Sequence, residues 1–453
     1  MRAFRYGIVL ALALGLASSL SLVAPAHAGA ASLPCDIYAA AGTPCVAAHS
    51  AVRALYASYN GSLYQVRRSS DGATTNIGLL STGGYANAAA QDAFCANTNC
   101  VITVIYDQSP QHNDLTIEGP GGNGGQDVGA NASALPVMVG GNKVYGVYIA
   151  GQTGYRRNNT TGIAVNGQAE GMYMVASGTH VNAGCCFDYG NAETNSADNG
   201  NGHMDAVNLG TECFFPPCSG GGPWVEADME NGLFSGGNGS NTANNGNNSA
   251  FVTALLKNNG QNTYALKGGN AQSGGLSTWW SGALPNRGGY IPMRQEGAIV
   301  LGTGGDDTNA SVGSFFEGVM TSGYPSDAAD NAVQANIVAV GYSGASGGGA
   351  PPAGTISGPG GQCVDVNGDD TGVDLTVVHL WTCQSYAIDQ HWTHNSDDSL
   401  ILQRYLARIA PSDRQTKGHL AAKLSDCTPA SRSLARPQET SNVVVLRTRA
   451  KIK

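Results

Sequence analysis

Short apolar runs, each ended by glycine or polar residues, constrain this chain most. The stretches "NCVITVIYD" (99–107), "KVYGVYIA" (143–150) and "GMYMVAS" (171–177) gather β-branched and aromatic residues over the length of a single strand. Glycine accounts for 64 of 453 residues and only 12% are charged, a composition that favours turns over long surface helices. The clearest helical periodicity is confined to 327–342. The sequence therefore predicts an all-β fold with many loops.

The first 28 residues have the features of a secretory signal peptide. Arg2 and Arg5 precede an apolar run, and Ala26-His27-Ala28 has the small-residue pattern of a cleavage site. We expect cleavage after Ala28 and a secreted, extracellular protein. Later segments do not reach about 18 uninterrupted apolar residues, the length of a membrane-spanning helix, so no membrane partner is predicted.

Secretion changes how the 11 cysteines are interpreted, because disulfides persist in oxidising compartments. Four pairs are close in sequence and are predicted to bond: Cys35–Cys45, Cys95–Cys100, Cys213–Cys218 and Cys363–Cys383. Cys185 and Cys186 are adjacent; a vicinal disulfide is favoured over two separate thiols or bridges to other partners, and Cys427 is left over. The cysteines and histidines do not have the spacing of a zinc site, so no metal and no cofactor are predicted.

Composition divides the chain into five parts. Residues 1–28 are the signal peptide. Residues 29–342 have a uniform pattern of short strands and glycine turns and form the predicted catalytic domain, and 343–354 ("SGASGGGAPPAG") form a linker. A second module occupies 355–400. From 401 to 453 there are 11 Lys and Arg against 3 Asp and Glu, which indicates either a frameshifted segment or a natural basic tail. The net charge of −9 for the whole chain argues against nucleic acid as a partner.

The second module resembles one repeat of a ricin-type β-trefoil lectin. The resemblance rests on the spacing of Cys363 and Cys383, on Asp365, and on Gln390 and Trp392 of a Gln-x-Trp motif. In that family the Gln-x-Trp packs the core and the early Asp hydrogen-bonds a sugar. A trefoil needs three such repeats to bury its apolar faces, so we expect a truncated lectin fragment.

Two acidic stretches are candidates for chemistry. In "VEADMENG" (225–232) Glu226, Asp228 and Glu230 alternate, and on a strand they would share one face with Trp224. Three carboxylates on one face repel each other and raise at least one pKa, as glycosidases require; the alternative is a solvated edge face. The second candidate is Asp306, which follows two glycines and so could sit where the backbone approaches a ligand; the alternative is an ordinary turn or a calcium-binding loop.

Longer motifs are similar to the catalytic domain of glycoside hydrolase family 54, the α-L-arabinofuranosidase B family. They are "PCDIYAAAGTPC" (34–45), "CCFDYGNAE" (185–193), "GHMDAV" (202–207), "DMENGLFSG" (228–236) and "EGVMTSGYPSD" (317–327). The resemblance covers about 33–342. It implies a large β-sandwich of the concanavalin and laminarinase type, and a retaining, exo-acting hydrolysis that releases terminal arabinofuranose from the plant cell-wall polysaccharides arabinoxylan and arabinan. A monomer is expected.

The same resemblance assigns roles to individual residues. By motif, Glu230 matches the nucleophile and Asp306 the general acid/base. Cys185 and Cys186 match a vicinal disulfide at the sugar subsite, and the positions that contact arabinose are Asp228, Asn231 and Gly305. The sequence departs from the family pattern at two places: Phe215 stands nearest to a tryptophan that walls the pocket, and residue 232 is Gly instead of a second Asn.

Two other functions remain open from the sequence. Glu226, Asp228 and Glu230 also fit the Glu-x-Asp-x-Glu signature of β-glucanases, in which Glu226 would be the nucleophile and Glu230 the acid/base. Under that interpretation Asp306 is dispensable. The third possibility is a non-catalytic carbohydrate-binding protein.

Overall fold

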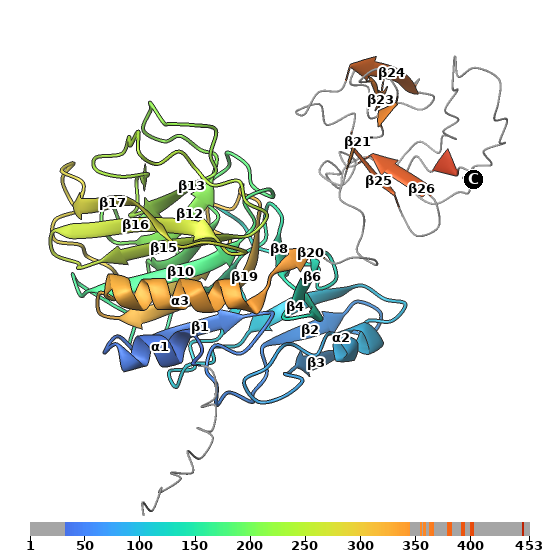
Figure 1. Cartoon of the computed structure of the whole chain (residues 1–453), viewed down its shortest axis with the longest axis horizontal. Coiled ribbons are helices and arrows are strands. Elements are labelled where there is room, and N and C mark those ends of the chain that lie inside the picture. Colours follow the sequence, from blue (N-terminus) through green and yellow to red (C-terminus); the bar gives the residue numbers. More distant parts are fainter. Residues whose placement is uncertain are drawn as a thin grey trace, which may run out of the picture.

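The computed structural model describes residues 32–344 and, beyond them, the backbone of short strands between 354 and 447 (Figure 1). The predicted signal peptide lies outside the described residues, and so do most of the predicted linker and basic tail. Of the linker, Ser343–Gly344 and Gly354 are in short strands, and of the tail only the backbone of 401–402 and Leu446–Arg447 is described. The side chains of the predicted Cys363–Cys383 disulfide and of the predicted lectin residues Asp365, Gln390 and Trp392 also lie outside the described part of the chain. The short strands beyond 344 are β21 (Gly354–Thr355), β22 (Ser357–Gly358), β23 (Gln362–Val366), β24 (Val378–Thr382), β25 (His391–His394), β26 (Ser399–Leu402) and β27 (Leu446–Arg447).

Two antiparallel sheets dominate residues 32–344. The first has the strand order β1-β19-β10-β15-β16-β17, with β8 also paired to β19. Its strands are β1 (Cys45–Ser50), β8 (Val147–Ile149), β10 (Glu170–Ala176), β15 (Val252–Asn258), β16 (Thr263–Asn270), β17 (Ser277–Ala283) and β19 (Gly313–Ser322).

The second sheet has the order β14-β13-β12-β11-β18-β9-β5-β4-β2-β3. Its strands are β2 (Tyr64–Arg68), β3 (Thr74–Ile77), β4 (Cys100–Ile105), β5 (Leu115–Ile117), β9 (Tyr155–Arg157), β11 (Asp188–Ala192), β12 (Asp205–Gly210), β13 (Trp224–Asp228), β14 (Leu233–Phe234) and β18 (Ala298–Leu301). A small third sheet joins β6 (Pro136–Val139), β7 (Asn142–Tyr145) and β20 (Ser343–Gly344). The remaining elements are two short helices, α1 (Pro34–Ala40) and α2 (Ala88–Phe94), and the longer α3 (Asp327–Val340).

The two large sheets pack face to face. Strands β10, β15 and β16 of the first sheet lie against β11, β12 and β13 of the second, and aromatic side chains such as Tyr189 and Phe315 fill the space between them. Sheets stacked in this way form a sandwich. The predicted all-β sandwich is therefore confirmed, and the three apolar runs fall on β4, on β7 and β8, and on β10.

Helix α3 covers the outer face of the first sheet (Figure 1). It begins after Ser326, whose hydroxyl accepts a hydrogen bond from the Ala329 amide, and it ends at Gly341 in the left-handed conformation. Because the helix covers one face and the second sheet the other, every residue of β10 and β15 is buried. The periodicity at 327–342 thus marks a real helix. Among the described residues, no helix is long and apolar enough to cross a membrane.

Four of the five predicted disulfides are present in the structure. They are Cys35–Cys45, Cys95–Cys100, Cys185–Cys186 and Cys213–Cys218. The first fastens α1 to the start of β1, and the second joins the end of α2 to β4. Each closes a short loop, so each restrains its own neighbourhood instead of joining distant parts of the chain.

A buried ion pair joins β19 to the segment after β1. The Arg53 guanidinium donates two hydrogen bonds to the Glu317 carboxylate, at 2.5 and 2.6 Å, and both side chains are almost fully buried. The hydroxyls of Tyr173 and Tyr342 donate to the same carboxylate, and Arg53 also donates to Asn336 of α3. This bidentate pair is fully hydrogen-bonded, the condition under which a buried charge is tolerated.

We expect Glu317→Gln to lower the free energy of unfolding by about 3–5 kcal/mol, because it leaves the Arg53 charge buried without its partner. Urea unfolding followed by circular dichroism measures the loss. The control is Asp71→Asn, which breaks the exposed pair between Arg68 and Asp71 and should change stability little. Equal stability of the two variants would contradict the prediction.

Candidate active site

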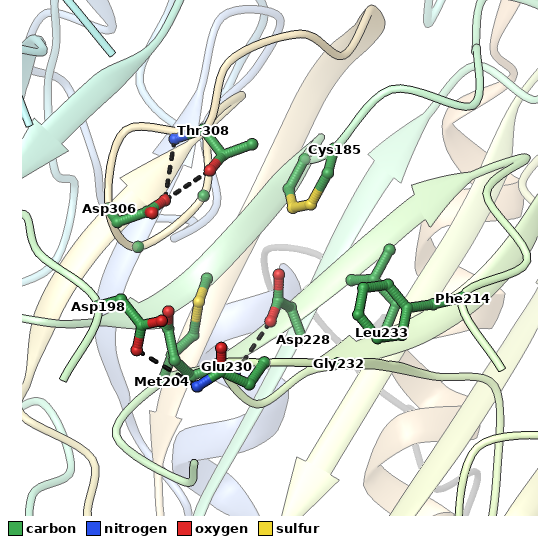
Figure 2. A pocket seen from close by; sticks show the side chains of 14 residues that line it. Cys185, Asp198, Met204, Phe214, Asp228, Glu230, Gly232, Leu233, Asp306 and Thr308 are labelled. Atoms are coloured by element: carbon green, nitrogen blue, oxygen red, sulfur yellow. Dashed lines mark hydrogen bonds between the residues drawn. A yellow bond between two sulfur atoms is a disulfide. The ribbon is translucent and has the colours of Figure 1, made fainter. Parts of the chain in front are cut away.

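One pocket collects most of the residues that the sequence singled out (Figure 2). It lies where the end of β13, the segment before β11 and the loop after β18 meet. Seven predicted site residues line it: Cys185, Cys186, Asp228, Glu230, Asn231, Gly305 and Asp306. Its other lining residues are Asp198, Met204, Phe214, Gly232, Leu233, Gly304 and Thr308.

Glu230 reaches the pocket from a turn and not from a strand. Strand β13 ends at Asp228, and both Glu230 and Asn231 have a left-handed backbone, with φ of 64° and 56°. The Asp228 carboxylate accepts a hydrogen bond from the Glu230 amide at 3.0 Å, which stabilises the turn. The predicted strand face is therefore correct for Trp224, Glu226 and Asp228 and wrong for Glu230. The alternative of a solvated edge face is also wrong, because all three carboxyl groups are buried.

Asp306 lies on the loop between β18 and β19. One of its carboxylate oxygens accepts hydrogen bonds from the Thr308 amide, at 3.1 Å, and from the Thr308 hydroxyl, at 2.6 Å (Figure 2). The Asp306 side chain is half-buried at the pocket. This geometry fixes one oxygen of the carboxyl group and keeps the group accessible to a ligand.

Gly305 is required by the close approach of two carboxyl groups. A Cβ atom at this position would lie 1.9 Å from Glu193 Oε2 and 3.0 Å from Glu230 Oε2. No side chain fits in that space, so glycine lets the loop that carries Asp306 pass directly beside both acids.

Glu193 is a site residue that the motif assignments missed. It follows β11, is fully buried, and its two carboxyl oxygens have no hydrogen-bond donor among the described residues. Burial raises the pKa of Glu193. Burial also raises the pKa of Glu230 well above its usual range, and Glu193 beside it adds to the rise. Both carboxyl groups approach Gly305, and we expect the pair to hold one proton between them.

Asp228, which lines the pocket, forms a second pair of acids with Asp188. Asp188 of β11 is fully buried, and burial followed by the Asp228 charge raises its pKa well above the usual range. Burial raises the pKa of Asp228 to about 7. Glu226 does not line the pocket, although it is two residues from Asp228 on the same strand, and burial raises its pKa as well.

The apolar wall of the pocket differs from the prediction by one residue. Phe214 lines the pocket and is 44% exposed, whereas Phe215 does not line it. The Phe215 ring packs on Phe234, with 5.0 Å between centroids, and lies under the Arg287 guanidinium. Phe215 is predicted to contact the substrate; in this structure its side chain packs against the core, and the contact itself stays a prediction. The Cys185–Cys186 disulfide lines the pocket beside Phe214 and Leu233 (Figure 2).

A family model described as "Alpha-L-arabinofuranosidase B, catalytic" matches residues 34–343. The chain belongs to this family. It is 57% identical over 337 residues to a probable alpha-L-arabinofuranosidase B of Aspergillus clavatus, a match that covers 73% of this chain and 65% of that protein. It is 58% identical over 316 residues to an alpha-L-arabinofuranosidase of Hypocrea jecorina, covering 68% of this chain and 63% of that protein. The chain thus spans a little under two thirds of the length of these relatives.

Solved structures agree with the family assignment. A crystal structure of an arabinofuranosidase complexed with arabinofuranosyl-alpha-1,2-xylobiose has a TM-score of 0.70 and 46% identity, covering 82% of this chain and 80% of that one. A family 54 α-L-arabinofuranosidase soaked with a cyclic sulfate inhibitor has the same TM-score and 47% identity, with the same coverage of both chains.

The shared proton of Glu193 and Glu230 predicts how stability depends on pH. The folded pair keeps a proton that the unfolded chain releases above pH about 4.3, so stability is lost as pH rises from about 5 towards 8. Glu193→Gln removes the neighbouring charge and lowers the pKa of Glu230. Between pH 5 and pH 8 we expect the unfolding free energy of Glu193→Gln to fall by about 1–2 kcal/mol less than that of the wild type.

Urea unfolding at pH 5 and pH 8 measures this difference for the wild type and the variant. Asp92→Asn is the control, because Asp92 is an exposed carboxylate paired with Lys143. A pH dependence in Glu193→Gln that equals that of the wild type would show that the two acids do not share a proton.

Proposed function

We propose that this protein is a secreted, monomeric, retaining α-L-arabinofuranosidase that removes terminal arabinofuranosyl residues from arabinoxylan and arabinan. The observation that carries the proposal is the meeting of Glu230 and Asp306 in one pocket. They come from different loops and face the same space (Figure 2). A retaining glycosidase requires such a pair of carboxyl groups on either side of the scissile bond.

In the proposed reaction Glu230 is the nucleophile. Its carboxylate attacks the anomeric carbon and forms a covalent glycosyl ester, while Asp306 gives a proton to the leaving oxygen. Asp306 then takes a proton from the water that hydrolyses the ester. The pKa of Glu230 is the more strongly raised of the pair, so the proton has to pass from Glu230 to Glu193 before Glu230 attacks as a carboxylate. The bonds that Thr308 donates to Asp306 hold one carboxyl oxygen, so that the other one carries the transferred proton.

The walls of the pocket support a sugar as the ligand. Asp228, Asn231 and Asp198 provide polar groups for hydroxyls, and Asn231 itself donates to Asp198 at 3.3 Å. The Cys185–Cys186 disulfide, Phe214 and Leu233 provide apolar surface for the ring face. The arabinofuranosyl xylobiose bound by the related solved structure supports a xylan-linked substrate.

Secretion is supported by the leader-like first 28 residues and by the four disulfides among the described residues. The β-glucanase alternative is not favoured, because it needs Glu226 and Glu230 at the same bond. Glu226 does not line the pocket, and Asp306 does.

We expect the full chain to hydrolyse 4-nitrophenyl α-L-arabinofuranoside. Glu230→Gln should lower kcat by about 10³-fold or more because it removes the nucleophile. Asp306→Asn should also lower kcat, and sodium azide should restore its turnover, because azide attacks the glycosyl ester without a general base. Release of 4-nitrophenol and the arabinosyl azide product are measured.

Glu226→Gln is the matched control, since it makes the same chemical change at a buried acid outside the pocket, and it should keep its activity. Cleavage of a β-1,3-glucan that is lost in Glu226→Gln and kept in Asp306→Asn would favour the glucanase. A folded wild-type chain that turns over neither substrate would favour a carbohydrate-binding protein.

A further inference from the structure

A glycine-rich loop at the surface closes on buried acids. The stretch "EGPGGNGGQD" (118–127) follows β5 and begins and ends with a carboxylate, Glu118 and Asp127. The Asp127 amide donates to the Glu118 carbonyl at 3.2 Å, which closes the loop. Glu118 is 1% exposed and Asp127 3%. A third acid, Asp307, is fully buried beside them, and one oxygen of each carboxyl group lies within 4.8 Å of the other two.

The positive charge beside this cluster is too small for three carboxylates. Arg156 donates to Glu118 Oε1 at 2.7 Å and also bonds the Glu193 carbonyl. Asn309, which is neutral, donates to Asp127 Oδ1 at 2.7 Å and to Asp307 Oδ1 at 3.3 Å. Among the described residues, no other side chain donates to the three carboxyl groups.

Two buried oxygens of the cluster are left without a partner. Glu118 Oε2 and Asp127 Oδ2 are inaccessible to solvent and accept no hydrogen bond among the described residues. Asp307 Oδ2 accepts only the Gly121 amide, at 3.1 Å. A buried carboxylate oxygen without a donor is costly unless a cation or a proton compensates it.

The titration of these groups agrees with crowded negative charge. Burial raises the pKa of Glu118 to about 8 in spite of the Arg156 charge, and the Asp307 charge adds to the rise. Burial and then the Asp307 charge raise the pKa of Asp127 to about 6.

We propose that Glu118, Asp127 and Asp307 bind a calcium ion. Calcium takes carboxylate oxygens at about 2.3–2.6 Å, so two oxygens on one ion lie at most about 5 Å apart, in agreement with the 4.8 Å limit of the cluster. The cluster has only oxygen donors, which disfavours zinc. Magnesium demands a near-ideal octahedron at about 2.0–2.1 Å and is usually held by only one or two carboxylates, which fits three buried carboxyl groups less well.

The backbone around the cluster also fits a bound ion. A Cβ at Gly124 would lie 2.5 Å from Asp307 Oδ2, and one at Gly154 would lie 2.3 Å from Asp127 Oδ2. Glycines at both positions let main chain approach the carboxylates, where carbonyl groups and water can complete the coordination. Gly122 and Asn123 of the same loop are exposed, so the loop that carries Glu118 and Asp127 borders the solvent.

The ion would fasten this loop to the segment that carries Asp306. The Asn123 amide already donates to the Asp306 carbonyl at 2.9 Å, and its side chain donates to Thr308 at 2.7 Å. The proposed site therefore concerns the stability of the protein and lies outside the pocket. It does not depend on the proposed hydrolysis, and binding is measured without a substrate.

The test uses the full chain, stripped with EDTA and then titrated with calcium chloride in a calorimeter. We expect one ion per chain, with Kd on the order of 10⁻⁴ M. Calcium at about 100 times Kd should raise the Tm by about 4–8 °C. Asp127→Asn and Glu118→Gln should each abolish both effects. Asp205→Asn is the matched control, because Asp205 is an equally buried acid elsewhere in the fold, and it should keep calcium binding.

A wild-type chain that shows neither saturable binding nor a Tm shift would overturn the proposal, because the acids would then be compensated by protons alone. Calcium binding that persists in a folded Asp127→Asn or Glu118→Gln would place the ion elsewhere. An equal shift with magnesium would overturn the choice of calcium. If one variant does not fold, the wild-type titration and the other variant decide.

Discussion

Lys257 and Lys267 meet the same two carboxylates in the space between the first sheet and α3. Each ammonium group bonds Asp327 and Asp330, at 2.5–2.9 Å, and Asp330 is fully buried. The pairing of Arg53 with Glu317 follows the same rule on β19. On this side of the molecule each buried acid is matched by a base, so α3 can cover the sheet without leaving an uncompensated charge.

The pocket side is compensated differently. Glu193 with Glu230, and Asp188 with Asp228, are pairs of acids whose pKa values burial raises. The raised pKa values favour the protonated forms of these groups, and protons can be moved during a reaction. The contrast separates a part of the fold that is stabilised by fixed charges from a part that is prepared for acid–base chemistry.

The sequence predicted the layers of the fold well and the local geometry of the pocket less well. Apolar runs and the periodic spacing of apolar residues indicate directly which residues are buried, so the sandwich and α3 could be predicted. The alternation of acids continued past the end of β13, although the Asn231-Gly232 pair is a turn signal that marks the change. Glu193 is the last residue of a recognised motif, but its contact with Glu230 joins separate strands, and no spacing rule reveals such a contact. The neighbours Phe214 and Phe215 differ only in the direction of their side chains, which depends on the backbone between β12 and β13.

Phe215 and Gly232, the two departures from the family pattern, occupy one volume. A Cβ at position 232 would lie 2.8 Å from a Phe215 ring carbon and 3.0 Å from Phe234. The aromatic ring at 215 therefore takes the space that a side chain at 232 would need. The side chains that fit at these two positions therefore depend on each other. A larger residue at 232 requires the ring at 215 to turn outward, and such a change would alter the rim of the pocket.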